Sequence, residues 1–303
     1  MERRRAAPDL FDQRRIFEAP SVRISRWRCR QSRPGPGSER YQPAPLMVFL
    51  HSGNFRVHSS ADIGLLDCTR VGFFNKDVPF RSAHPYSGGD AGAEFAFRAD
   101  VLADVFGAPA ADRPDHPFPT GWGPLGHDAF LLQSVILRKC GPAGADELEI
   151  EELSLRLAAR VAGSAFANAP RPPERAGSRE REEAEAVRGV LSRRPGARHR
   201  LDDLASRFGS TPFRLCRTFR AATGTTIHRY LTAVRLHRAI DRLAGGCRDL
   251  ADLAFDLGFS SHSHFTATFR RRLGATPDDV RELAGRRDLS ALRGKLGPAA
   301  ARN

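Results

Sequence analysis

The sequence predicts an α+β protein of two domains, a β-rich N-terminal domain followed by an all-α C-terminal domain. Short apolar and alternating segments, separated by turn residues, fill the first part of the chain. An internal repeat with helical periodicity fills much of the last part. A Pro/Arg-rich stretch separates the two. The 303 residues, 41% of them hydrophobic, are enough to form two cores.

The N-terminal domain is predicted to cover residues 21–168, after a disordered stretch at residues 1–20. Two of its strands are expected to form a hairpin around Ser52-Gly53-Asn54. A Pro-rich loop at 109–124 follows the last strand, and two helices then close the domain, at 130–138 and 148–162. The spacing is typical of a small β-barrel or sandwich, with strands expected at 46–50, 55–58, 63–66, 70–74, 80–82 and 93–98.

Residues 169–179 are predicted to be a linker, because Pro170, Pro172 and Pro173 disfavour both helix and strand. The charge changes across this linker. Residues 1–178 hold 23 basic and 21 acidic side chains, whereas residues 179–303 hold 25 and 14. Only three of the 48 basic residues are lysines, and the arginine guanidinium suits phosphates and guanine edges. The composition therefore indicates a polyanionic partner for the C-terminal domain.

The C-terminal part contains two copies of one unit. Residues 201–209, Leu-Asp-Asp-Leu-Ala-Ser-Arg-Phe-Gly, match residues 250–258, Leu-Ala-Asp-Leu-Ala-Phe-Asp-Leu-Gly. Further along, Phe219, Arg220 and Gly224 correspond to Phe269, Arg270 and Gly274. The repeat predicts two similar helical units rather than one continuous bundle.

Each unit has the layout of a helix-turn-helix. A short helix ends at a glycine suited to a left-handed conformation, and a Ser/Thr cap begins a second helix. Thr211 is the predicted cap in the first unit, and Ser260 or Ser261 in the second. A helix of about 27 Å, at 1.5 Å per residue, is expected between the units. Apolar spacing predicts this helix over 227–243, a leading helix around 187–191, and a closing helix that begins at Thr276-Pro-Asp-Asp279.

In the second helix of each unit, the residues that face the core determine which of the other side chains face outward. Leu215 with Phe219, and Phe265 with Phe269, are four residues apart and are expected to face the core. The remaining side chains of the second helices can hydrogen-bond to or pack against bases and phosphates.

Residues 184–282 resemble the DNA-binding domain of AraC/XylS-type transcriptional regulators, which predicts this domain at 180–285 and leaves 286–303 as a basic disordered tail. The resemblance rests on the repeat and on a signature in the second unit, formed by Gly258, Phe259, Phe265, Phe269, Arg270, Gly274, Pro277 and Arg281. In the same family, the N-terminal domain is often a cupin-like β-barrel that binds an effector or dimerises. The resemblance therefore implies a cupin-like domain with two trailing helices at 21–168.

The resemblance implies a sequence-specific transcription regulator, often an activator, that reads two successive major grooves of double-stranded DNA. Its partners would be DNA, RNA polymerase and a second copy through the two trailing helices. The resemblance also implies a response to a small-molecule effector of unknown identity, and no cofactor. The location would be cytoplasmic, at the nucleoid. The implied DNA-binding residues are Thr211, Phe213, Arg214, Cys216, Arg217, Arg220, Ser261, His262, Ser263, His264, Thr266, Arg270 and Arg271.

Within this set, Phe213, Cys216 and Arg217, together with residues 262–264 and Thr266, would read bases. Arg220, Arg270 and Arg271 would contact phosphates. Ala267 stands opposite Arg217 in the repeat, so the second helix is expected to read fewer bases directly and to use the backbone or DNA shape.

Simpler interpretations stay open for several of these residues. Surface arginines are often only solvated charges. Phe213 could belong to the core, His262 and His264 could be caps or structural polar residues, and Cys216 could be a tolerated small residue rather than a redox sensor. The five cysteines are scattered without a CxxC pair, which indicates reduced thiols.

Two other classes of function compete with the regulator. The first is a metal-dependent cupin enzyme with a DNA-binding appendage, in which His51, His58 and His84 would be the ligands. The His-x-His spacing of metal-binding cupins and the common catalytic motifs are missing from the sequence, so we predict no enzyme activity, metal or cofactor. The second is a protein whose N-terminal domain only dimerises. No apolar run is long enough to span a membrane.

Overall fold

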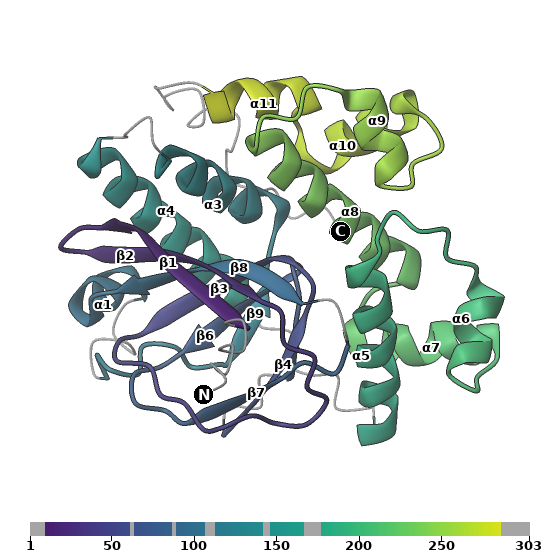
Figure 1. The fold of residues 1–303 in the computed structure, drawn as a ribbon, viewed down its shortest axis with the longest axis horizontal. Coiled ribbons are helices and arrows are strands. Elements are labelled where there is room, and N and C mark those ends of the chain that lie inside the picture. Colours follow the sequence, from purple (N-terminus) through teal and green to yellow (C-terminus); the bar gives the residue numbers. More distant parts are fainter. Residues whose placement is uncertain are drawn as a thin grey trace, which may run out of the picture.

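The computed structural model describes residues 10–60, 64–86, 89–106, 113–141, 146–166 and 177–285. It has a sheet-containing N-terminal part and a helical C-terminal part, which lie side by side (Figure 1). This confirms the two-domain α+β class. The predicted tail at 286–303, most of the predicted linker and residues 1–9 lie outside the described residues.

The N-terminal part contains two antiparallel sheets. The larger has the strand order β1-β2-β8-β3-β6-β9 and the smaller has the order β5-β4-β7. The strands are β1 Phe11–Glu18, β2 Val22–Cys29, β3 Leu46–Ser52, β4 Phe55–Ser59, β5 Gly64–Leu66, β6 Arg70–Phe74, β7 Phe80–Ala83, β8 Asp90–Phe97 and β9 Trp122–Pro124.

Strand β3 shows how the layers form. Its side chains alternate between faces, and both faces are covered. Leu46, Val48 and Leu50 pack into a cluster shared with the smaller sheet. Met47 and Phe49 pack into a second cluster with the helices. An uninterrupted apolar run is therefore what this strand requires, and the order of layers is small sheet, large sheet, helices.

The expected cupin-like barrel is not confirmed, because within the described residues no strand ladder joins the two sheets. The predicted hairpin around Gly53 is wrong, since β3 belongs to the large sheet and β4 to the small one. Gly53 has a φ of 71°, and the buried Asn54 side chain donates to Gly189 O at 3.2 Å and to Ser192 Oγ at 2.8 Å. The chain passes from the large sheet to the small one at Gly53 and Asn54, and the bonds of Asn54 to the next domain hold it there.

The prediction of disorder at residues 1–20 is wrong for its second half, which forms β1. This strand pairs with β2 along an edge of the large sheet, and its central residues, which include Arg14 and Arg15, are exposed. Charges on an edge strand hide the alternating pattern that reveals a half-buried strand. Strands β2 and β9 and helix α1 (Ala99–Phe106) also went unpredicted.

The two trailing helices are confirmed as α3 (His127–Lys139) and α4 (Glu147–Phe166). Every residue of α3 from Ala129 to Leu137 is buried, because the helix packs against α4 on one side and against the C-terminal part on the other. Helix α3 is therefore covered by the chain itself and offers no free face for a second copy.

The C-terminal part has the predicted order of helices. Helix α5 begins at Ser178, inside the stretch predicted as linker, and the Thr276/Asp279 capping box opens the last helix, with Asp279 N donating to Thr276 Oγ1 at 3.1 Å and Thr276 N to Asp279 Oδ2 at 2.8 Å. The helices are α5 Ser178–Arg193, α6 Leu201–Arg207, α7 Pro212–Thr223, α8 Ile227–Ala244, α9 Leu250–Asp256, α10 His262–Leu273 and α11 Pro277–Gly285.

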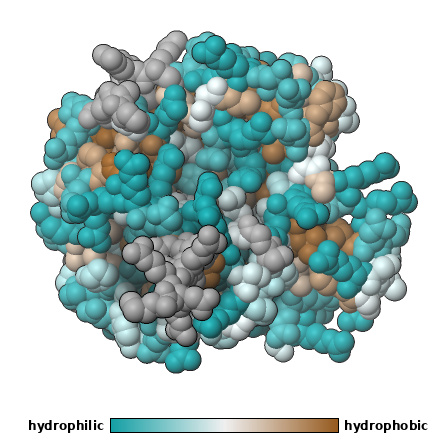
Figure 2. Space-filling view, in the orientation of Figure 1, coloured by the Kyte–Doolittle hydropathy of each residue, from teal (hydrophilic) through white to brown (hydrophobic). Residues whose placement is uncertain are grey.

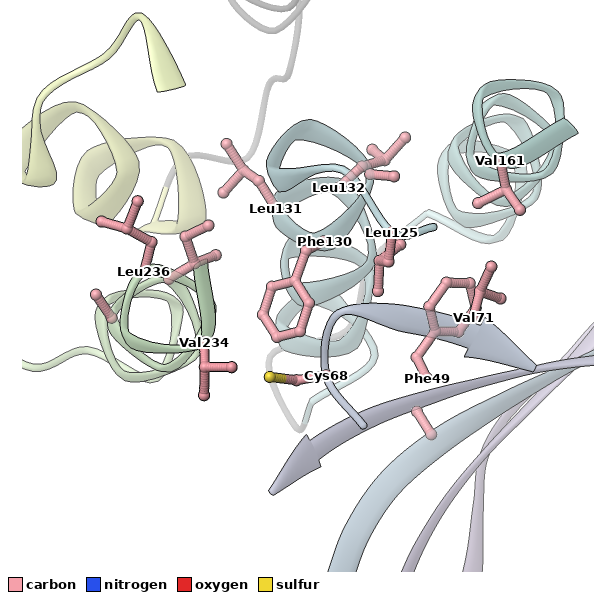
Figure 3. Close-up of a cluster of buried hydrophobic side chains, with 14 of the residues drawn as sticks. Phe49, Cys68, Val71, Leu125, Phe130, Leu131, Leu132, Val161, Val234 and Leu236 are labelled. Atoms are coloured by element: carbon pink, nitrogen blue, oxygen red, sulfur yellow. The ribbon is translucent and has the colours of Figure 1, made fainter. Parts of the chain in front are cut away.

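One continuous hydrophobic cluster joins the two parts. Figure 3 shows Phe130 and Leu131 of α3 beside Val234 and Leu236 of α8, with Phe49 of the large sheet beneath. Burial of this kind contributes roughly 1.5–3 kcal/mol per large apolar side chain. The linker helix α8 is therefore a core element of both parts.

The surface seen in Figure 2 is mostly hydrophilic, with smaller hydrophobic patches. Among the described residues, no helix is both long and apolar enough to cross a membrane.

Candidate nucleic-acid interface

The first helix-turn-helix unit consists of α6 and α7. Gly209 follows α6 with a φ of 59°, a left-handed conformation that glycine adopts without strain. Thr211 then caps α7, accepting a hydrogen bond from Arg214 N at 3.3 Å, and Pro212 is the first helical residue. These local features fix where α7 begins and which of its faces is turned inward.

The second unit, α9 and α10, repeats this construction. Gly258 has a φ of 76°, and Ser261, rather than Ser260, is the cap, accepting from His264 N at 3.1 Å. Ser260 Oγ instead lies 3.0 Å from His264 Nδ1. The buried residues of the two second helices correspond one to one, at Leu215/Phe265, Thr218/Thr268 and Phe219/Phe269.

All thirteen predicted DNA-binding residues lie on α7, on α10 or at their caps, and none of them is buried. Phe213 is 78% exposed, so it is not a core residue. Thr266 and Ser261 are half-buried, and Thr266 Oγ1 lies 3.4 Å from His262 Nε2. The structure therefore places the predicted set on two exposed helix faces; whether they contact DNA stays a prediction.

The two units are held against each other. A Cβ atom added to Gly196, in the loop before α6, would lie 1.9 Å from Asp256 O at the end of α9. Arg235 of α8 donates from Nε to Pro195 O at 2.8 Å, and its guanidinium lies 5.8 Å from the ring centre of Phe259. The relative position of α7 and α10 is therefore set by direct contacts as well as by α8.

A buried polar cluster ties this domain to the N-terminal part. Arg188 of α5 donates to Asp67 Oδ2 at 2.6 Å, and the Tyr230 hydroxyl of α8 donates to the same oxygen at 2.7 Å. The other oxygen, Asp67 Oδ1, accepts from Thr69 N at 2.8 Å and Thr69 Oγ1 at 2.6 Å. Burial alone would raise the pKa of Asp67, but Arg188 and these hydrogen bonds lower it.

Helix α8 makes further polar contacts with the N-terminal part. His237 Nδ1 donates to Cys68 O at 2.7 Å, and its ring stacks on Phe130 with centres 4.2 Å apart. His51 Nδ1 lies 2.7 Å from Asp241 Oδ1, and Arg238 donates to His51 O at 2.6 Å. The helix that joins the two units therefore also contacts the N-terminal domain along most of its length.

The buried histidines predict a loss of stability at acid pH. Burial lowers the pKa of His237 well below its usual value, and burial, aided by Arg272, lowers the pKa of His127 to about 4. Below about pH 6.5 the unfolded chain binds protons that the folded chain does not, so the free energy of unfolding falls as pH decreases. We expect urea midpoints to fall between pH 7 and pH 5.

The matched variant is His237→Asn, whose amide can still donate to Cys68 O but does not titrate. A shallower pH slope than in the wild type is expected, with His58→Asn, on the exposed face of β4, as the control. Equal slopes in all three proteins would contradict this account.

The three histidines considered as metal ligands do not converge. His51 faces Asp241, His58 is exposed, and His84 lies in the cavity between the sheets. Within the described residues, the one group with ligand atoms close together is Cys29, His84 and Asp90.

Sequence reasoning missed the residues that join the domains. Arg188 sits in a helix rich in charged residues, where a buried arginine gives no signal, and Asp67 lies in a short turn. The apolar spacing predicted the linker helix over 227–243, which contains Tyr230, but it gave no sign that the Tyr230 hydroxyl bonds to Asp67.

Comparison with known proteins gives one family model and several similar proteins. A family model described as "Helix-turn-helix domain" matches residues 204–283. The chain is 35% identical over 81 residues to the HTH-type transcriptional activator RhaS of Klebsiella pneumoniae, covering 27% of this chain and 29% of RhaS. It is 29% identical over 150 residues to the virulence regulon transcriptional activator VirF of Yersinia enterocolitica, covering 50% of this chain and 53% of VirF.

Solved structures are also similar. A regulator with an AraC-type DNA-binding domain from Chromobacterium violaceum aligns with a TM-score of 0.34 and 24% identity, over 36% of this chain and 98% of that one. ToxT of Vibrio cholerae O395 aligns with a TM-score of 0.34 and 10% identity, over 91% of this chain and all of that one. The sequence matches span less than a third of RhaS and about half of VirF.

Proposed function

Because residues 204–283 of this chain match a family model for a helix-turn-helix domain, we propose that the protein is a sequence-specific, AraC-type DNA-binding regulator of transcription that inserts α7 and α10 into successive major grooves. The supporting observation is the matched exposure of these two helices. Both begin at a side-chain cap and bury the same three positions, and both present polar or cationic side chains outward.

The two helices have different chemistry and hence different roles. Helix α7 presents Arg217, whose planar guanidinium can bind a guanine edge through two hydrogen bonds. Helix α10 has Ala267 at the corresponding position and ends in Arg270, Arg271 and Arg272. We assign base recognition mainly to α7, and phosphate contacts and shape recognition mainly to α10.

The N-terminal domain is proposed to bind an effector, and the buried contacts along α8 are the route by which that domain would act on the DNA-binding units. Two observations support this. The domain has a cavity between its sheets, and α5 and α8, which flank the first unit, both contact it through Asp67. That the two sheets close into a cupin-like barrel stays a prediction.

Activation through RNA polymerase is proposed by likeness to RhaS and VirF, which are named transcriptional activators. For a homodimer, α4 is the remaining candidate surface, since α3 is covered. Leu148 is 70% exposed, and Ala159 and Gly163 are exposed on the same side of α4.

The test of DNA recognition is selection of bound duplexes from a random-sequence library, followed by affinity measurement over a range of salt concentrations. We expect an enriched motif with two parts about one helical turn, or ~34 Å, apart. Affinity for it should fall steeply with salt, because contacted phosphates release counterions. Salt-dependent binding without any enriched motif would contradict sequence-specific recognition.

A further inference from the structure

The cavity between the two sheets contains a buried carboxylate oxygen with which no described residue pairs. Asp90 is 4% exposed and lines this cavity. Its Oδ2 lies 2.7 Å from His84 Nδ1, whereas its Oδ1 has no hydrogen-bond partner within the described residues. An unpaired buried acceptor costs free energy. A ligand that donates a hydrogen bond to this oxygen would recover that cost.

A hydrogen bond across the cavity holds the carboxylate in place. Asp90 begins β8 of the large sheet, and His84 follows β7 of the small sheet. Their hydrogen bond therefore joins the two sheets and occupies one carboxylate oxygen. The other oxygen is left for a molecule that enters the cavity. That molecule must be a donor, because an ionised carboxylate only accepts.

The size and the walls of the cavity suit a small organic molecule. Trp27, Phe55, Phe74 and Phe80 line it with aromatic rings, which favour the apolar part of a ligand. Its volume is about 80 Å³. A water molecule takes up about 30 Å³ in the liquid, so the space corresponds to about two or three waters, or to an organic molecule of about four heavy atoms.

The cavity also offers hydrogen-bond donors. Gln31 and Gln42 line it, and a side-chain amide can donate to a carbonyl oxygen. An acceptor at Asp90 and donors at these amides match a ligand that carries a donor and an acceptor on separate atoms. A primary carboxamide has this arrangement, whereas a hydroxyl places both on one oxygen.

The charges around the cavity favour a neutral ligand. Burial alone would lower the pKa of His84, but its hydrogen bonds to Asp90 and Cys29 raise it to about 9, so the ring is a cation at neutral pH. His84 and Arg40 thus balance the carboxylates of Asp90 and Glu94 on the cavity walls. Burial raises the pKa of both carboxyls, so negative charge is already penalised here. A neutral donor leaves this balance unchanged, whereas an added ion disturbs it.

We propose that this cavity binds a small neutral primary carboxamide, whose N–H group donates to Asp90 Oδ1 and whose carbonyl oxygen accepts from Gln31 or Gln42. Its apolar end lies against the aromatic rings. No covalent bond forms or breaks. The proposal rests on the effector role proposed above for the N-terminal domain, and it names the chemical class of that effector.

The test compares the binding of acetamide, acetate, acetamidinium and 2-propanol, which have the same number of heavy atoms, to the whole chain without DNA. Saturation-transfer NMR detects binding, and a titration gives the Kd. We expect a Kd of about 1–10 mM for acetamide, because so few atoms supply little binding free energy. Acetate presents only acceptors to Asp90 and acetamidinium adds a charge, so both should bind at least about tenfold more weakly. 2-Propanol should bind about threefold more weakly, since it has one polar atom.

Asp90→Asn is expected to reverse the preference. The asparagine oxygen can keep the hydrogen bond to His84, and its amide nitrogen then offers a donor to the cavity in place of the acceptor. We expect acetamide to bind this variant about tenfold more weakly than the wild type, and acetate to bind it more tightly. Loss of folding cannot produce such a gain. Asp12→Asn, at an exposed position on β1, removes the same charge and should keep the wild-type order.

Equal binding of acetamide to the wild type and to Asp90→Asn would overturn the proposal. Tighter binding of any of the other three molecules than of acetamide to the wild type would also overturn it. A chain that selects a DNA motif but does not bind acetamide contradicts this inference alone, and a chain that binds acetamide but selects no motif contradicts the proposed regulator. Acetamide binding that leaves affinity for the selected DNA site unchanged would overturn its role as effector.

Discussion

Arg217→Ala is expected to weaken binding to the selected DNA site by about 10- to 100-fold, that is ~1–3 kcal/mol, and to relax the sequence preference at one position. The side chain is exposed on α7, one turn beyond its capped start, on the helix face opposite to Leu215 and Phe219. The measurement is fluorescence anisotropy with the selected duplex and with a random duplex at one salt concentration.

The matched control is Arg28→Ala, which removes the same charge from an exposed position on β2. It should leave both affinities almost unchanged. If Arg217→Ala weakens binding to both duplexes equally, Arg217 contacts the backbone and the assignment of base recognition to α7 is wrong.

Arg188→Met is expected to lower the free energy of unfolding by ~3–5 kcal/mol, because it leaves the Asp67 carboxylate buried without its cation. The thermal midpoint should fall by roughly 10 °C for a chain of this size. Arg181→Met, an exposed position on the same helix, is the control and should change it little. Calorimetry measures both.

The double variant Asp67→Asn/Arg188→Met distinguishes loss of the ion pair from loss of packing. The asparagine oxygen can still accept from Thr69 or Tyr230, and the charges of both members of the ion pair are removed together. We expect it to recover a large part of the stability that Arg188→Met loses. Asp67→Asn is measured as the second single variant. If the double variant loses as much free energy of unfolding as the two single variants lose together, the ion-pair account is wrong.

The contribution of Asp67 to the pH dependence of stability should also change sign in Arg188→Met. In the wild type the pKa of Asp67 is lowered relative to the unfolded chain, so its contribution to stability is present above the unfolded pKa and is lost as pH falls through the folded one. Without Arg188, burial dominates and the pKa of Asp67 rises. Arg188→Met should then lose less stability than the wild type as pH is lowered toward 5, whereas its Asp67→Asn derivative should lose as much as the wild type.

The sequence was sufficient for the elements whose patterns are local. The repeat of Leu201–Gly209 at Leu250–Gly258 predicted both units, because caps, left-handed glycines and inward pairs are each encoded within a few residues. The outward faces of α7 and α10 followed from those inward pairs, and the resemblance to the AraC/XylS family supplied the DNA-binding residues on them.

The predictions that failed concern segments whose structure depends on contacts between residues distant in sequence. Strand β1 looks polar because it lies at a sheet edge, and the turn after β3 looks like a hairpin because the contacts of Asn54 with α5 are more than 130 residues away. The Cys29, His84 and Asp90 group went unpredicted for the same reason. Each residue is ordinary by itself, and only strand register and the facing of two sheets bring them together.

The close approach at Gly196 limits what kinds of DNA site this protein can use. Because there is no room for even a methyl group between that loop and the end of α9, we expect this close packing to hold the two units in one relative position. A regulator with a flexible joint can tolerate a base pair added between its half-sites, because the joint absorbs the added rise and rotation. Here that adjustment would fall on the DNA, which must bend or twist, so the phase between the two parts of an operator is expected to be as restrictive as their sequence.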